Sequence, residues 1–145
     1  MTKVDVYAAS TGTPAAVWAH LADVRCWPRW SPFDSASLDV PGTGSENGVG
    51  AVRRYRLGAR TTIERVVLFE PPVRLAYELV SGIQARDYRA TVTLTASGGG
   101  TGIHWHAAFH PVWPGSGVVT ALVLRRFITR VARGLAAHAA TCSGC

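Results

Sequence analysis

The chain has 145 residues, of which 48% are hydrophobic and 17% are charged, and its formal net charge is +6. This length suits one domain with a sizeable core, and the low share of charged residues excludes an intrinsically disordered chain. No apolar run reaches the ~18 residues of a transmembrane helix and the first ten residues carry no apolar leader, so we expect a cytoplasmic protein.

The N-terminal part of the chain predicts a strand and then short helices. Residues 3–9 alternate between apolar and polar side chains, which is typical of a strand. Thr13 and Pro14 suit the N-cap and first position of a helix, which we expect to end before Pro28. The stretch DVRCWPRWSPF, residues 23–33, would then form the exit of this helix and a second tight turn.

The middle of the chain predicts a series of short strands. A strand at 35–40 precedes a glycine-rich loop, PGTGSENGVG at 41–50, which we expect to form a flexible lip of a pocket. Turn signals such as GA, EPP, SG and SGGG separate the later strands, and such short connections indicate an antiparallel meander. These later strands are expected at residues 51–57, 60–69, 74–80, 86–95 and 102–112.

Residues 117–140 contain no proline and have the pattern of a long amphipathic helix. Arg126, Arg130 and Arg133 lie on its polar side, which we interpret as a solvated outer face. The apolar stripe of the helix must pack on another element, and the predicted sheet is the one large partner. This stripe consists of Leu124, Phe127, Ile128, Val131 and Leu135.

Three motifs occur in a fixed order before the long helix. They are ADV-x-x-WP-x-W at 22–30, GAVRRY at 50–55 after the glycine-rich loop, and the strand–PP-x-RL–strand hairpin IERVVLFEPPVRLAYEL at 63–79. Together with the terminal helix they resemble the polyketide cyclase/dehydrase branch of the START-related superfamily, the helix-grip or Bet v 1-like proteins. The resemblance covers essentially the whole chain.

The resemblance implies an α+β helix-grip fold. A curved antiparallel sheet of about seven strands would wrap on the long C-terminal helix, with two short helices after the first strand and an apolar cavity between sheet and helix. It implies one domain over residues 1–141, and we expect residues 142–145 to be a flexible tail. The WP-x-W segment would form part of the cavity wall and rim, with Trp27 anchoring the turn.

Strand parity and the helix stripe place many aromatic residues on inward faces, a pattern that suits either a filled core or the wall of a cavity. The resemblance favours the cavity, with Trp30 and Phe33 facing or guarding it. We predict that the ligand-binding residues are Trp30, Phe33, Tyr55, Tyr77, Tyr88, Trp105, Phe109, Phe127 and Val131.

Two arginines share parity with apolar strand positions. Arg53 lies in phase with Tyr55, and Arg65 in phase with Ile63, so both are expected to point inward or to the cavity mouth. An inward arginine is costly unless it is paired, and outward ion pairs remain the alternative. Related aromatase/cyclases are thought to use a cavity arginine with tyrosines, which makes Arg53, Arg65 and Tyr88 the catalytic candidates.

Histidine and cysteine offer weaker signals. His104, His106 and His110 share one strand face opposite the apolar one, so we expect them to point to solvent, with a metal as the alternative. The terminal CSGC has C-x-x-C form but follows a helix end, where a redox pair is not expected. We therefore predict no metal and no cofactor.

The predicted function is binding of a small hydrophobic molecule, such as a lipid, a polyketide or an aromatic metabolite, in the cavity. One alternative is a polyketide aromatase/cyclase or dehydratase acting in the same cavity. Another is a non-catalytic partner protein that acts through its basic helix or as a homodimer. No nucleic-acid partner is expected, because the basic helix lacks interleaved aromatic residues.

Overall fold

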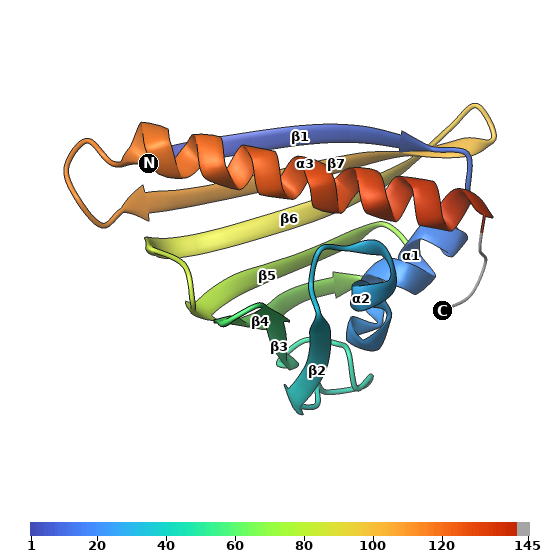
Figure 1. Cartoon of the computed structure of the whole chain (residues 1–145). Helices are drawn as coiled ribbons and strands as arrows, with labels where there is room; N and C mark the ends of the chain where they lie inside the picture. The colour runs from blue at the N-terminus through green and yellow to red at the C-terminus, as the bar shows by residue number, and fades with distance from the viewer. Residues whose placement is uncertain (142–145) are drawn as a thin grey trace.

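The computed structural model describes residues 1–141 and contains one mixed set of strands and helices. Its secondary structure begins with a strand, continues through three short helical turns and six further strands, and ends with a long helix (Figure 1). In chain order the elements are β1 (Thr2–Ser10), α1 (Pro14–Ala22), the 3-10 turn η1 (Val24–Cys26), α2 (Trp27–Trp30), β2 (Ser35–Val40), β3 (Val52–Leu57), β4 (Arg60–Glu70), β5 (Arg74–Ser81), β6 (Ala85–Ser97), β7 (Gly100–Pro111) and α3 (Gly117–Thr141).

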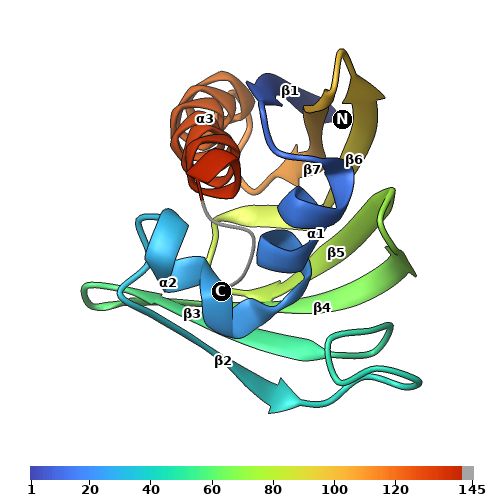
Figure 2. The same ribbon diagram turned by 90° about the vertical axis from the view of Figure 1, so that its right-hand side faces the viewer.

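All seven strands form one antiparallel sheet in the order β1-β7-β6-β5-β4-β3-β2. From β2 to β7 each strand pairs with its neighbour in sequence, as the short turns predict, and β1 then pairs with β7. The sheet curves strongly, so that β2 and β3 lie on the opposite side of the molecule from β1 (Figure 2). Helix α3 runs along the inner side of this curve beside β1 and β7 (Figure 1).

The inner face of the sheet and the apolar stripe of α3 form the core. On β7 the alternate residues Ile103, Trp105, Ala107 and Phe109 are at most 1% exposed, as the period-2 pattern predicts. On α3 the buried residues recur every three or four positions, which places them on one side of the helix. These helix residues are Leu124, Ile128, Val131, Ala132, Leu135, Ala136 and Ala139.

The segment between β1 and β2 folds into three short helices because each begins with a capping residue or a proline that favours the start of a helix. The Thr13 hydroxyl accepts a hydrogen bond from the Ala16 amide at the N-terminus of α1, and Pro14 occupies the first helical turn. The Asp23 carboxylate then caps η1 by accepting from the Arg25 amide. As a result α1 and α2 close one end of the curved sheet (Figure 2).

The predicted helix-grip architecture is confirmed: seven antiparallel strands, two short helices after the first strand, and a long C-terminal helix. Each predicted strand lies within a few residues of the observed one. Within the part of the chain that the structure describes, no helix has the length and apolar character needed to cross a bilayer. The tail predicted at 142–145 lies outside the described residues.

Candidate functional site

A pocket of about 280 Å³ lies between the inner face of the sheet and α3. Its lining is mostly apolar and aromatic, with a few polar side chains from β4, β5 and β6. This composition is typical of a small-molecule site. The lining residues are Trp27, Phe33, Leu57, Arg60, Thr62, Glu64, Tyr77, Ile83, Gln84, Tyr88, Trp105, Val119, Thr120, Val123, Leu124, Phe127, Ile128 and Val131.

The mouth of the pocket lies where lining side chains are exposed. Leu57 and Arg60 flank the β3–β4 turn, and Ile83 and Gln84 belong to the β5–β6 turn. Val119, in the first turn of α3, is 64% exposed although it lines the pocket. The pocket therefore opens between these two hairpin turns and the N-terminal end of α3.

Trp27 forms the inner end of the pocket. Its indole Nε1 donates to the Leu21 carbonyl oxygen at 2.9 Å, which satisfies its polar atom at the exit of α1. Its ring centroid lies 4.6 Å from that of Trp30, 5.0 Å from that of Tyr55 and 6.0 Å from that of Trp105. Trp27 thus connects the short helices to β3 and β7 and presents an aromatic surface to the pocket.

Phe33 closes the side of the pocket between the sheet edge and the helix. It lies just before β2, and its ring makes an edge-to-face contact with Phe127 of α3 at a centroid distance of 5.4 Å. On its other side Phe33 packs against Tyr55 of β3 at 4.8 Å. Phe33 and Phe127 are both only partly buried, so this aromatic contact is a partly exposed section of the pocket wall.

A buried chain of hydrogen-bonding groups lines the sheet side of the pocket. The Trp105 Nε1 donates to the Tyr77 hydroxyl at 3.1 Å, and a side-chain hydrogen bond also links Tyr88 to Tyr77. Burial raises the pKa of both tyrosines well above the ordinary value, so their hydroxyls stay protonated. The wall therefore offers neutral hydroxyl groups to a ligand.

Glu64 adds a carboxyl group to the same wall. It lies on β4, is 8% exposed and lines the pocket. Burial raises the pKa of this carboxyl to about 8, against the opposing effect of the positive charge on Arg53. At neutral pH the Glu64 carboxyl is then mostly protonated and can donate a hydrogen bond.

Arg53 points inward but does not line the pocket. It is 1% exposed, and its Nη2 donates to the carbonyl oxygens of Ala22 and Asn47. Ala22 is the last residue of α1, where an arginine is favoured by the helix dipole. The guanidinium group thus joins β3 to the end of α1, and this position does not support a direct catalytic role.

The prediction that Arg65 points inward is wrong. Arg65 is exposed and forms an ion pair with Glu78 on the outer face, at 3.1 Å. On β4 the inward positions are Thr62, Glu64 and Val66, in the opposite phase to the one predicted. The pairing of β4 with β5 shifts register at two places, so the apolar pattern of this strand does not reveal its inner face.

The predicted glycine-rich lip is also wrong. No residue of 41–50 lines the pocket. Asn47 is buried in this loop instead, and its side-chain oxygen accepts a hydrogen bond from the Val24 amide at 3.2 Å. The loop therefore packs against η1, behind the wall rather than at the mouth.

The predicted ligand-binding residues divide into two groups. Three of them, Trp30, Tyr55 and Phe109, are buried behind the pocket and do not line it. Lining residues that the sequence reasoning missed include the buried Glu64 and, at the mouth of the pocket, Val119 and Val123 of α3. The predicted residues that do line the pocket are Phe33, Tyr77, Tyr88, Trp105, Phe127 and Val131.

Comparison with known proteins identifies the family. Residues 1–140 match the family model described as polyketide cyclase/dehydrase and lipid transport. The chain has no significant match among curated protein sequences.

Solved structures share the fold at low sequence identity. The protein XoxI from Bacillus cereus has a TM-score of 0.80 at 18% identity, with 94% of each chain covered. A START superfamily protein from Mycobacterium smegmatis has a TM-score of 0.81 at 11% identity, over 96% of this chain and 97% of that one. Ara h 8.0201 has a TM-score of 0.74 at 13% identity, over 94% and 96%.

The family match spans nearly the whole chain, and these structures share its curved sheet and long helix. The chain therefore belongs to the polyketide cyclase/dehydrase and lipid transport family and has the fold of START and Bet v 1-like proteins.

Proposed function

We propose that the protein binds a small, mainly hydrophobic molecule in the pocket between the sheet and α3. The observation that carries this proposal is the apolar pocket of about 280 Å³ with the buried Glu64 carboxyl on its wall. Its volume is near the lower end of the ~300–1,000 Å³ usual for ligand pockets. A compact ring system or a short acyl chain fits such a volume better than a long lipid.

The polar groups on the wall define what else the ligand needs. Protonated Glu64 is a hydrogen-bond donor inside an apolar site, and so is one of the hydroxyls of Tyr77 and Tyr88, because the bond between the two tyrosines uses the proton of the other. A ligand carbonyl or other neutral acceptor satisfies them, whereas a carboxylate would have to lose its hydration in apolar surroundings. We therefore expect a neutral ligand that carries at least one carbonyl or hydroxyl oxygen.

A first experiment asks whether the protein retains such a molecule. Freshly purified protein is measured by native and by denaturing mass spectrometry. A discrete extra mass that disappears on denaturation supports the proposal and gives the mass of the ligand. Whether or not an extra mass is found, the probe titration described next tests directly whether the pocket binds a small hydrophobic molecule.

The second experiment uses the neutral fluorescent probe N-phenyl-1-naphthylamine and two matched variants on α3. Val131→Phe adds a ring to the pocket, whereas Leu122→Phe adds the same ring type at a position that is 62% exposed and does not line it. We expect Val131→Phe to weaken probe binding at least tenfold and Leu122→Phe to leave it unchanged. Equal affinity of the two variants, both shown to be folded by circular dichroism, would argue against the pocket.

Glu64 also supports a second candidate function, an acid-assisted dehydration or cyclisation of a polyketide-like substrate. A carboxylic acid that is protonated at neutral pH can protonate a departing hydroxyl group. Water then leaves, and the Glu64 carboxylate accepts a proton from the neighbouring carbon, which regenerates the acid. Glu64→Gln keeps the shape of the side chain but cannot transfer this proton, so it should abolish turnover of a short β-hydroxyketone and retain its binding. Unchanged turnover in Glu64→Gln would remove this candidate.

A further inference from the structure

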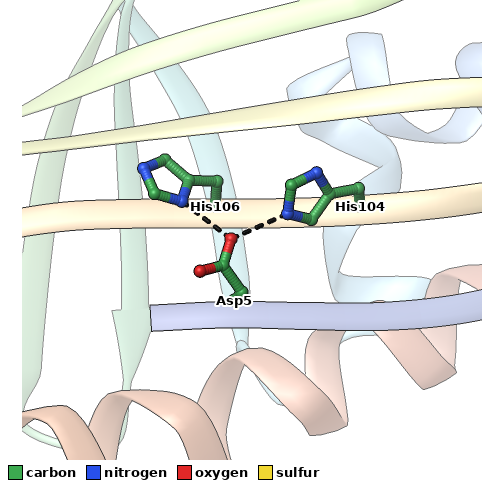
Figure 3. A group of neighbouring side chains, drawn as sticks. All are labelled: Asp5, His104 and His106. Atoms are coloured by element: carbon green, nitrogen blue, oxygen red, sulfur yellow. Dashed lines mark hydrogen bonds and ion pairs between the residues drawn. The ribbon is translucent and has the colours of Figure 1, made fainter. Parts of the chain in front are cut away.

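A second group of chemically active side chains lies on the outer face of the sheet, opposite the pocket. The Asp5 carboxylate of β1 lies between the rings of His104 and His106 of β7 (Figure 3). The neighbouring positions Val6 and Trp105 are buried on the inner face, so these three side chains point away from α3.

The backbone brings the three residues together. In the pairing of β1 with β7, Asp5 lies directly opposite His106, and Tyr7 lies opposite His104. His104 and His106 are two residues apart, so their rings project from the same face of one strand. Asp5 therefore reaches both rings from the neighbouring strand, across a separation of about a hundred residues in sequence.

The distances between these side chains suit one metal ion that all three would coordinate. The Asp5 Oδ1 lies 2.8 Å from the His104 Nε2 and 2.8 Å from the His106 Nδ1 (Figure 3). One ligand atom from each residue lies within 4.8 Å of the others. A tetrahedral ion with bonds of about 2.0–2.1 Å holds its ligand atoms roughly 3.3 Å apart. Binding an ion would require side-chain rotations that lengthen the two 2.8 Å contacts and bring the two imidazole nitrogens, at most 4.8 Å apart, to that spacing.

We propose that Asp5, His104 and His106 bind a divalent transition-metal ion of the zinc type. Two imidazole nitrogens and one carboxylate oxygen are a ligand set that suits Zn²⁺, Ni²⁺ or Cu²⁺, whereas Mg²⁺ and Ca²⁺ prefer oxygen ligands. Three protein ligands leave a further position for water or a small anion. The ion would also link the edge strand β1 to β7.

Neighbouring groups favour a defined arrangement of the ligands. The Tyr7 ring stacks on the His104 ring with centroids 4.5 Å apart and an interplanar angle of 4°, which restrains the orientation of that imidazole. Arg125 of α3 donates to the Asp5 backbone oxygen at 2.9 Å, which holds this part of β1 in place.

His110 provides a matched control on the same strand face. It lies four residues beyond His106, about 13 Å away at the rise of a strand, which is too far to share an ion. Replacing His110 therefore removes one imidazole from the same strand face without changing the proposed site. The proposal is also independent of the pocket, which lies on the other face of the sheet.

The test is a calorimetric titration of the full-length protein with ZnCl₂, repeated with CoCl₂ while the visible absorption of bound Co²⁺ is recorded. We expect one ion per chain in the wild type, and at least about a tenfold loss of affinity in His104→Ala, His106→Ala and Asp5→Asn, because changes in a metal's outer shell alone cost about 10–100-fold. His110→Ala should bind like the wild type. The Co²⁺ spectrum should lack a thiolate charge-transfer band, which separates this site from any binding by cysteine.

Three results would overturn the proposal. One is the absence of Zn²⁺ binding below millimolar concentration, which would mean that the three residues form only an ion pair. Another is Zn²⁺ binding that survives all three ligand substitutions. The third is an equal loss of affinity in His110→Ala and the ligand variants. Because the three side chains are on the surface, circular dichroism of each variant is expected to match that of the wild type.

Discussion

Arg53 of β3 and Glu64 of β4 are direct register partners, and both side chains are buried, but no ion pair joins them among the described residues. The guanidinium group bonds instead to the carbonyl oxygens of Ala22 and Asn47. The positive charge of Arg53 therefore acts on Glu64 and opposes the rise of the Glu64 pKa, but the two side chains do not form an ion pair.

This relationship separates two tasks that a single ion pair would combine. Arg53 stabilises the junction of α1 and the glycine-rich loop, away from the pocket. Glu64 keeps its carboxyl group at the pocket wall, where no described side chain or backbone amide donates to it. A ligand or substrate can therefore use this carboxyl group without first breaking an ion pair.

The first prediction compares the two arginines that the sequence singled out. Arg53→Met should destabilise the protein by about 1–3 kcal/mol, because it leaves the buried carbonyl oxygens of Ala22 and Asn47 without this donor. Arg65→Met removes an exposed ion pair with Glu78 and should cost less than about 1 kcal/mol. Urea denaturation of both variants measures the difference, and equal losses would contradict the assigned positions.

The second prediction concerns the pH dependence of stability through Glu64. Its pKa is raised from 4.5 to about 8 in the folded protein. Between these values the unfolded chain releases the proton and the folded chain retains it, so stability should fall as pH rises from about 4.5 to 8. Glu64→Gln removes this dependence and should gain stability relative to the wild type across that range, by on the order of 5 kcal/mol at pH 8.

Chemical denaturation at pH 4.5, 6, 7 and 8.5 measures this effect. Glu70→Gln is the control, because Glu70 lies on the same strand but is exposed and paired with Arg74. The control should follow the wild-type pH profile. A constant difference between Glu64→Gln and the wild type at all four pH values would mean that the carboxyl is ionised in the folded state.

The architecture could be predicted from the sequence because its signals are local. Alternating residues on β1 and β7, short glycine-containing turns and the apolar stripe of α3 each specify an element within a few residues. The order of these elements then leaves few ways to cover the apolar faces. Local signals therefore predicted the elements and their order, and the resemblance to the helix-grip proteins supplied the way they pack together.

The site could be predicted only in part, because it depends on register. Glu64 and Arg65 are adjacent, and only one of them can face the pocket on a strand. The register shifts in β4 decide which of the two side chains faces the pocket, and no residue pattern in that strand predicts these shifts. In the same way, the contact of Asp5 with His104 becomes visible only when the pairing of β1 with β7 is known.

The third prediction concerns the close approach of α3 to the tryptophan-rich turn. A Cβ atom added at Gly134 would overlap the backbone carbonyl oxygen of Trp30. Alanine is favoured over glycine in a helix by about 1 kcal/mol, but the overlap should outweigh this gain and destabilise Gly134→Ala by about 1–3 kcal/mol. Gly102→Ala on β7 is the control, since its Cβ would make only an ordinary contact at 3.7 Å. Thermal unfolding of both variants distinguishes them, and a stabilised Gly134→Ala would show that α3 does not pack this closely.

The fourth prediction concerns the hydroxyl of Tyr77, which accepts the hydrogen bond of the Trp105 indole. Tyr77→Phe preserves the ring but leaves this buried N–H without its acceptor, which should cost about 1–3 kcal/mol of stability. The Trp105 indole proton should then exchange faster with solvent and shift upfield in the NMR spectrum, because its hydrogen bond is lost. Tyr7→Phe is the control, because it removes the hydroxyl of a residue that is 74% exposed. It should change neither the stability nor the exchange and chemical shift of the Trp105 indole proton. If Tyr77→Phe matched this control, the Trp105 N–H would have another acceptor in solution, and Tyr77 would be free to bind a ligand through both its donor and its acceptor.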